Sequence, residues 1–421
     1  MIFRILFVLT LIFFANEGFT LAPWWHRSGA FNIADVGNGL IWIGIFLTPL
    51  LVRKRKELVN PISALIFFYV LFASIHIVLA KANYGQSLFD GLIGIRHQFY
   101  YFSFFLFLLL FDDTKIIVQL LDTLVIISII LVILGIVNYF GPTILYHKWA
   151  HGQKMRGGIT RAFIPGMSVV TFSALWVFNK WIGVNQKIIT KASTIFLLAA
   201  HFFRQSRMRL IGLIFMMSSV LVIKRKWKPL LVLLVCSMAT YVMLEAKIGK
   251  DIMANLFTSA YEDVVEQTGT MRPRLKEIRI DLKEFRRHPL IGSGLAAIRS
   301  TTGLGGSRLR LKLKDLSYRS DLGYTHWLKF YGMVGVVWLL LFFFFQAYYG
   351  IKALKKCVGM DKAIAMFTLT YLGYIIVSFF TLNHLMFPRG IVMVCLNSAI
   401  IIRLHFNSRS RIAAHDKRSQ P

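Results

Sequence analysis

The apolar residues of this chain gather into blocks close to twenty residues long, separated by short polar or basic segments. A helix rises about 1.5 Å per residue and a bilayer core is about 30 Å thick, so blocks of this length suit helices that cross a membrane. The composition agrees, with 56% hydrophobic residues, 16% charged residues and a mean hydropathy of +0.62. We therefore expect an all-α polytopic membrane protein.

The blocks predict about twelve transmembrane helices and one large loop. Spans one to nine occupy residues 1–246, the loop occupies 247–324, spans ten to twelve occupy 325–404, and a basic tail occupies 405–421. The first block resembles a secretory signal, but an even number of spans suits the charge pattern, so we expect it to be retained. The predicted spans are 2–15, 35–52, 61–80, 92–111, 117–138, 163–183, 192–203, 209–223, 229–245, 325–349, 362–382 and 386–404.

Basic residues in the short loops predict the orientation, because Lys and Arg accumulate on the cytoplasmic side. With the N-terminus inside, the basic clusters at 53–56 and 224–228 and the C-terminal tail are cytoplasmic, and the large loop is outside. The net charge of +30 would suggest nucleic acid in a soluble protein. Here the basic residues divide between two membrane faces, so we expect the lipid bilayer and no nucleic acid as a partner.

The large loop keeps an excess of positive charge, with fifteen basic residues and eight carboxylates over 247–319. Long loops translocate regardless of charge, so the excess is compatible with an outside location. Two interpretations stay open: a solvated or headgroup-facing surface, or a docking face for an anionic substrate. Arginine donates two parallel hydrogen bonds to a phosphate, which favours the second, and the short outside segments add Arg96, Arg156, Arg161, Arg204, Arg207 and Arg209.

One amphipathic helix is predicted within the loop, over 271–287. Thr270 can cap it, Pro273 is tolerated in its first turn, and Pro289 prevents its continuation. We expect the helix to lie along the membrane surface, with Arg274 in a first turn whose free N–H groups favour an anion. Its apolar stripe comprises Leu275, Ile278, Leu282 and Phe285, and a flexible turn at Gly292, Ser293 and Gly294 follows it.

Neither a metal nor a cofactor is expected. The three cysteines are odd in number and far apart, which argues against a disulfide framework or a cysteine-type zinc site. His147 and His151 have a spacing that can bind zinc on a helix, but no third ligand is evident. Glu262, Asp263 and Glu266 form the only acidic cluster expected outside, and they lack an Asp-x-Asp arrangement.

Several short motifs resemble the bacterial O-antigen ligase and polymerase superfamily, which comprises Wzy-like polymerases and WaaL-like lipopolysaccharide ligases. The spacing from Arg274 to Pro289, the twelve spans and the large loop between the ninth and tenth spans also resemble that family. The matching pieces are Ser206-Arg207, Arg274-Leu275 with Ile278, the segment from His288 to Gly294, Asp321-Leu322-Gly323-Tyr324, and Gly332-Met333-Val334-Gly335.

The resemblance implies a GT-C-like glycosyltransferase in the bacterial inner membrane, with its large loop and active site in the periplasm. Its substrates would be an undecaprenyl-diphosphate-linked glycan donor and a glycan acceptor, and a chain-length regulator is a further partner. Many members, ligases especially, have a His-Asn pair eleven residues before the glycine that Gly332 matches. Here Asp321 occupies that place after Ser320, which is more similar to polymerases of O-antigen, capsule or exopolysaccharide repeats.

In this family reaction the leaving group is a diphosphate, whose developing charge needs stabilisation. The resemblance and the residue types assign diphosphate binding to Arg207 and Arg274 first, and to Arg96, Arg156 and Arg161 second. Asp321 would be the catalytic base that accepts the proton of the acceptor hydroxyl. A single base without a second carboxylate suits one-step inverting transfer better than double displacement.

Simpler interpretations stay open beside these roles. Asp321 can pair with Arg319 and only anchor the tenth span, and the arginines can reach headgroups or solvent. His326, two residues inside the tenth span, is either an interior histidine or a secondary proton acceptor. A ligase that transfers glycan to lipid A core is the alternative enzyme, and a polytopic transporter or flippase is the alternative class, although the two halves of the chain show no similarity.

Overall fold

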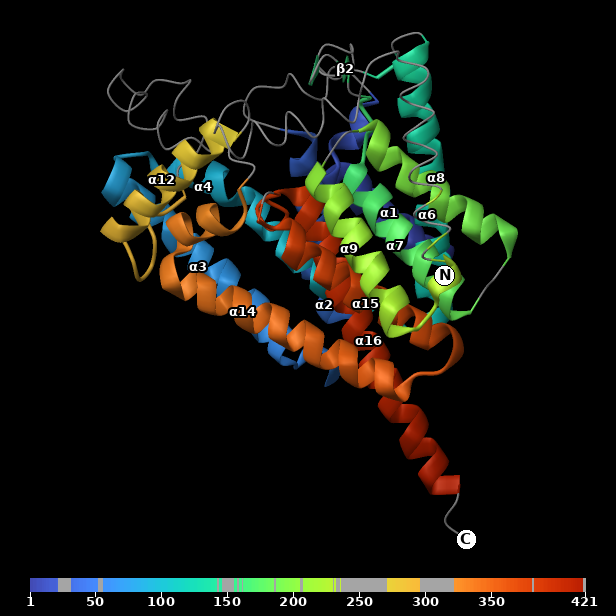
Figure 1. Ribbon diagram of the computed structural model, residues 1–421. Coiled ribbons are helices and arrows are strands. Elements are labelled where there is room, and N and C mark those ends of the chain that lie inside the picture. The colour runs from blue at the N-terminus through green and yellow to red at the C-terminus, as the bar shows by residue number, and fades with distance from the viewer. Residues whose placement is uncertain are drawn as a thin grey trace.

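The computed structural model describes residues 1–21, 32–51, 56–141, 144–145, 155–156, 159–160, 162–184, 187–204, 207–229, 231, 235, 271–295, 322–380 and 382–418. These residues form a helical bundle (Figure 1). The regular strand structure among them is one antiparallel pair, β1 (Met155–Arg156) with β2 (Ile159–Thr160).

The helices follow the apolar blocks closely. Eleven of the twelve predicted spans coincide with helices, and the ninth, 229–245, lies almost entirely outside the described residues. The helices are α1 (Ile2–Ala15), α2 (Ile33–Leu51), α3 (Pro61–Tyr84), α4 (Leu88–Ile95), α5 (Ser103–Leu110), α6 (Thr114–Phe140), α7 (Met167–Gly183), α8 (Ile188–Phe203), α9 (Arg207–Ile223), α12 (Met271–Arg287), α14 (Tyr324–Lys356), α15 (Gly359–Ser378) and α16 (Pro388–Arg418), with short 3₁₀ segments η1 (Glu17–Thr20), η3 (Lys56–Leu58) and η4 (Arg96–Phe102).

Six stretches in the described part of the chain are long and apolar enough to cross a membrane. They are α3, the combined stretch from α4 to α5, α6, α14, α15 and the apolar part of α16. The helices α1, α2, α8 and α9 contain shorter apolar segments. The structure is therefore that of a helical protein suited to a membrane, and the count of twelve spans stays a prediction.

Helix α16 occupies the centre of the bundle. In its apolar part 89% of the residues are buried, whereas the corresponding figure for α6 is 39%, so α6 lies at the periphery. Around α16 pack α5, α14 and α15, and α7 packs between α15 and α8. On the outer side of α7, the carboxylate of Asp122 on α6 accepts a hydrogen bond from Trp176 and lies 2.7 Å from the Lys180 ammonium.

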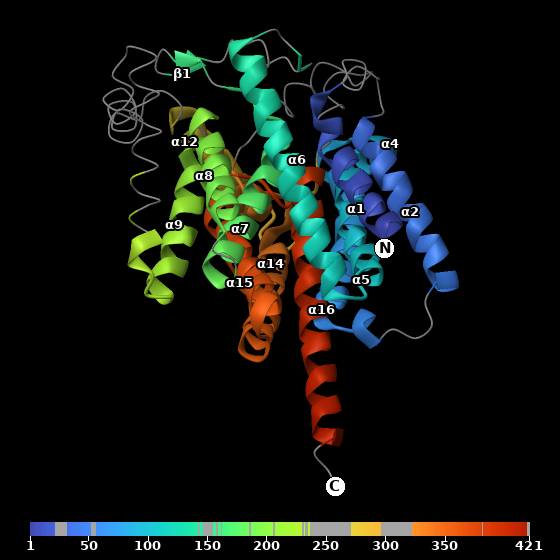
Figure 2. The same cartoon turned by 90° about the vertical axis from the view of Figure 1, so that its right-hand side faces the viewer.

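The helix ends segregate to two opposite ends of the bundle (Figure 2). At the end from which α16 projects, Arg4 pairs with Asp112, and Arg403 lies 3.0 Å from Glu57. The other end, called here the α12 end, holds α12, β1 and the start of α9 (Figure 2). Among the described residues, the end of α9 and the C-terminal part of α16, both expected to be cytoplasmic, lie at the first end, and α12, expected outside, lies at the other (Figure 2).

Helix α14 bends at Gly332, and the chain after α12 fills the bend. Gly332 has φ 59° and ψ −158°, so the amides of Met333 and Val334 lose their helical partners. They donate instead to the carbonyls of Pro289 and Leu290, at 2.9 and 3.0 Å. In return the Lys329 carbonyl accepts from the Ser293 amide at 3.0 Å. Residues 288–294, which we call the strap, thus satisfy the backbone on both sides of the bend.

Candidate functional site

The structure describes some of the predicted site residues fully, some by their backbone alone, and others not at all. Asp321 and Arg161 lie outside the described residues. For Arg207 and Arg156 the structure describes the backbone, at the first residue of α9 and the second of β1, but not the side chain. Arg274 is described fully, in the first turn of α12. Arg96, also described, begins η4.

Contacts between helix ends bring the start of α9, the first turn of α12 and the start of α14 to one region of the α12 end. The start of α9 packs on α15, where a Cβ on Gly212 would lie 3.2 Å from the Tyr374 ring. The start of α14 packs on the end of α15, since Tyr324 Oη donates to the Ile376 carbonyl at 2.9 Å. Helix α12 packs on the start of α14. We call this row of α9, α15, α14 and α12 ends the candidate site.

A buried charged cluster joins α12 to α14 within the candidate site. Asp281 Oδ2 accepts a hydrogen bond from His326 Nδ1 at 2.9 Å, and Asp281 Oδ1 lies 3.0 Å from Lys329 Nζ. All three side chains are at most 2% exposed. We call Asp281, His326 and Lys329 the buried triad. Of these residues sequence reasoning singled out only His326.

The triad keeps Asp281 ionised although it is buried. Burial alone would raise the pKa of the Asp281 carboxyl, but the hydrogen bond from His326 and the charge of Lys329 together hold that pKa below its usual value. The carboxylate fixes the imidazole with its proton on Nδ1, which leaves the lone pair on Nε2. Within the described part of the chain, this buried Nε2 has no hydrogen-bond partner.

A second set of contacts binds the α12 segment to α3. Tyr84 Oη donates to Glu284 at 3.3 Å, and Asn83 Nδ2 donates to the Ser293 carbonyl at 2.9 Å. Glu284 also pairs with Arg287 on its own helix at 3.1 Å. The α12 segment is therefore held between the end of α3 and the start of α14.

The predicted helix over 271–287 is present as α12, but its buried face was predicted incorrectly. Asp281 and Glu284 are buried, whereas Leu282, assigned to the apolar stripe, is 38% exposed. Hydrophobic periodicity assigns every charged side chain to the solvent-exposed face of a helix. This assignment fails for a charged side chain that is buried because it binds partners on another helix. The spacing of Asp281, Glu284 and His288 by three and four residues is the signal that could have found this face.

The expectation of a flexible turn at Gly292, Ser293 and Gly294 is wrong. All three residues are buried. A Cβ on Gly292 would overlap the Phe330 carbonyl and come within 2.6 Å of the Tyr331 amide. These glycines allow two backbones to cross closely, which is why small residues stand on both sides of the bend.

Arg96 belongs to a different contact. Its guanidinium lies 2.9 Å from Asp35 Oδ2, and its carbonyl accepts from Asn38 Nδ2. Both partners belong to α2, and the ion pair is mostly buried. The structure thus places Arg96 at the packing of η4 on α2, and its diphosphate role stays a prediction.

The turn between α15 and α16 adds a neutral imidazole beside the start of α9. His384 Nε2 lies 2.9 Å from Ser378 Oγ. Burial, and then the nearby charges of Arg209 and Arg389, lower the pKa of His384 from 6.5 to about 3. Arg209 stands two residues after Arg207, so the first turn of α9 faces this turn.

The lowered pKa of His384 predicts a loss of stability in mild acid. The unfolded imidazole binds a proton near pH 6.5, whereas the folded one stays neutral to about pH 3, so this contribution is complete above pH 6.5 and is lost as the pH falls. Between pH 6.5 and about pH 5 the free energy of unfolding should fall by roughly 2 kcal/mol more in the wild type than in His384→Asn. Thermal unfolding in detergent at each pH measures the two slopes, and equal slopes would contradict the assignment.

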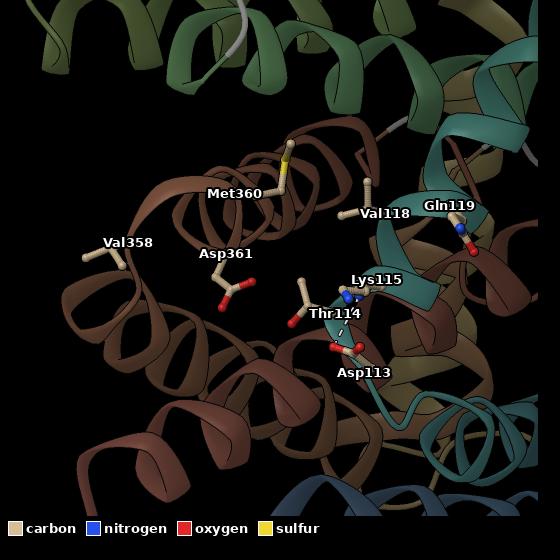
Figure 3. Close-up of a pocket in the computed structure, with 8 residues that line it drawn as sticks. All are labelled: Asp113, Thr114, Lys115, Val118, Gln119, Val358, Met360 and Asp361. Atoms are coloured by element: carbon tan, nitrogen blue, oxygen red, sulfur yellow. Dashed lines mark hydrogen bonds between the residues drawn. The ribbon is translucent and has the colours of Figure 1, made fainter. Parts of the chain in front are cut away.

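A pocket of about 500 Å³ lies away from the candidate site, between the starts of α6 and α15 (Figure 3). Asp113, Thr114 and Lys115 line it from α6 and the residue before it, and Val358, Met360 and Asp361 line it from the other side. Asp112, which pairs with Arg4 at the end from which α16 projects, directly precedes the first of these residues. The pocket therefore has no part in a site built at the α12 end.

Comparison of the chain with known protein families found no family model that matches, and comparison with curated proteins found no match either.

Proposed function

We propose that the protein is a membrane glycosyltransferase that polymerises oligosaccharide repeat units carried on a polyprenyl diphosphate in a bacterial inner membrane. The observation that supports this most is the joining of four helix ends at the α12 end. That arrangement brings the start of α9, the first turn of α12 and the start of α14 into one region. Arg207 and Arg274 belong to the first two of these segments, and Asp321 precedes the third by three residues in the chain; the motifs assign the chemistry to these residues.

The proposed step is a single inverting displacement. The acceptor hydroxyl oxygen attacks the anomeric carbon of the donor sugar while the bond from that carbon to the diphosphate oxygen breaks. Asp321 takes the hydroxyl proton, and the lipid diphosphate leaves with the bonding electron pair. Arg207 and Arg274 stabilise the charge that develops on the leaving group, and the positive end of the α12 dipole adds to that field.

If Arg207 and Arg274 bind the diphosphate, the rate of chain growth should depend strongly on their guanidinium groups. Replacing Arg207 or Arg274 by Lys keeps the charge but removes the paired hydrogen bonds, so the rate of chain growth should fall roughly 10- to 100-fold. The rate is measured with purified protein in lipid nanodiscs and a synthetic polyprenyl-diphosphate oligosaccharide. Arg279→Lys is the matched control, since Arg279 lies on the exposed face of α12 and should retain the full rate. Full rates in both site variants would place diphosphate binding elsewhere.

The same assay tests the function itself. The wild type should lengthen the glycan and release polyprenyl diphosphate in equal amounts. Transfer only to an added lipid A core would identify a ligase, and the absence of both products would exclude the proposal. A deletion strain gives an independent result: single repeats on lipid A core indicate loss of a polymerase, whereas polymer left on its lipid carrier indicates loss of a ligase.

A further inference from the structure

The buried triad joins the two elements that carry the proposed diphosphate clamp and the proposed base. Asp281 belongs to α12, and His326 and Lys329 belong to the first two turns of α14. A buried carboxylate and ammonium hold each other through both Coulomb attraction and a directional hydrogen bond, so this contact defines one position of α12 along α14. Neighbouring apolar contacts tolerate small displacements more readily.

Arg274 stands on the same face of α12 as Asp281. Seven residues separate them, which is two helical turns or about 10 Å along the axis. Arg274 is half-buried, whereas Arg279 between them is exposed. The face that Asp281 holds against α14 is therefore the face from which Arg274 projects.

We infer that Asp281 is a positioning residue that acts through Arg274. By binding His326 and Lys329 it fixes how far α12 lies along α14, and so where the Arg274 guanidinium meets the donor diphosphate. This inference rests on the proposed function. It adds a specific cause for the buried charges, because the strap hydrogen bonds fix only the chain after α12, whereas Asp281 fixes the helix itself, seven residues from Arg274.

Replacing Asp281 by Asn keeps the size of the side chain but removes the negative charge that lies 3.0 Å from the Lys329 ammonium. A displacement of a binding group by about 1 Å can cost about 10²-fold, so kcat/KM for the diphosphate-linked donor should fall roughly 10- to 100-fold. Glu284→Gln is the matched control, since Glu284 is a second buried acid on α12 that contacts Arg287 and α3 instead of α14. It should leave kcat/KM within about twofold of the wild type.

A double-mutant cycle with Arg274→Ala separates positioning from a structural role. If Asp281 acts through Arg274, then Asp281→Asn should change kcat/KM by less than about twofold once Arg274 is alanine. If Asp281 only stabilises the fold, the two losses multiply, and that result would overturn the inference. Wild-type kinetics in Arg274→Ala would instead refute the role of Arg274 in the proposed function, and the inference with it.

A second variant covers the case in which Asp281→Asn does not fold. Asp281→Asn combined with Lys329→Met removes both charges of the ion pair and should restore a normal unfolding temperature. The donor kcat/KM should stay low in this folded variant, because the directional contact is still missing. Recovery of wild-type kcat/KM would show that the charges do not position Arg274.

Discussion

Replacing Asp321 by Asn should reduce polymer formation by roughly 10²–10⁴-fold, the contribution expected from a general base. The amide has the size of the carboxylate but cannot accept the hydroxyl proton, so the donor should still bind while transfer stops. The measurement is the length distribution of glycan made by the variant, together with the rate in nanodiscs.

Asp315→Asn provides the control for this result. Asp315 is another carboxylate of the large loop, six residues before Asp321, and belongs to none of the motifs. It should leave glycan length unchanged. Both variants should be present in the membrane at the wild-type level. Near-normal glycan length in Asp321→Asn would remove Asp321 from the role of base.

Replacing Gly292 by Ala should destabilise the protein by roughly 2–5 kcal/mol, the sum of the cost of overpacking and of a left-handed backbone at a residue with a Cβ. Gly292 has φ +76°, and its Cβ would overlap the Phe330 carbonyl. The methyl group would push the strap away from the bend in α14 and leave the amides of Met333 and Val334 without their acceptors. The unfolding temperature in detergent measures the loss.

Gly85→Ala separates the two costs. Gly85 has φ +69°, close to that of Gly292, but a Cβ there would meet no atom within 4 Å. This variant should lose only about 1–2 kcal/mol, the cost of the backbone conformation. Equal losses at both positions would show that the close crossing at Gly292 does not limit stability.

The positions of the helices could be predicted from the sequence because each apolar block is long enough to define its own element. Helix α12 could also be predicted, since Pro289 limits its extent and its apolar residues recur at helical spacing. Which face of α12 is buried against its neighbours could not be predicted. The face against α14 carries Asp281 and Glu284, and their partners Lys329 and Tyr84 lie 48 and 200 residues away in the chain. Only the fold brings such partners together.

The candidate site was predictable in part. Two of the glycine-containing motifs identified in the sequence are the strap and the bend at Gly332, and the structure brings these two into contact. Their physical role was not evident, since glycine permits both a mobile turn and a tight crossing. The buried triad was missed because an aspartate in an amphipathic helix ordinarily faces water. The burial of His384 was not predicted either, because nothing in its local sequence indicates it.

The strap also constrains the order in which the protein is assembled. Residues 288–294 are synthesised before α14, and their contacts with His76 and Asn83 involve only residues made earlier. The carbonyls of Pro289 and Leu290 are therefore made before the amides of Met333 and Val334, from which they accept hydrogen bonds. The bend in α14 can form only where the strap supplies these acceptors, which makes the start of α14 dependent on correct docking of the loop segment before it.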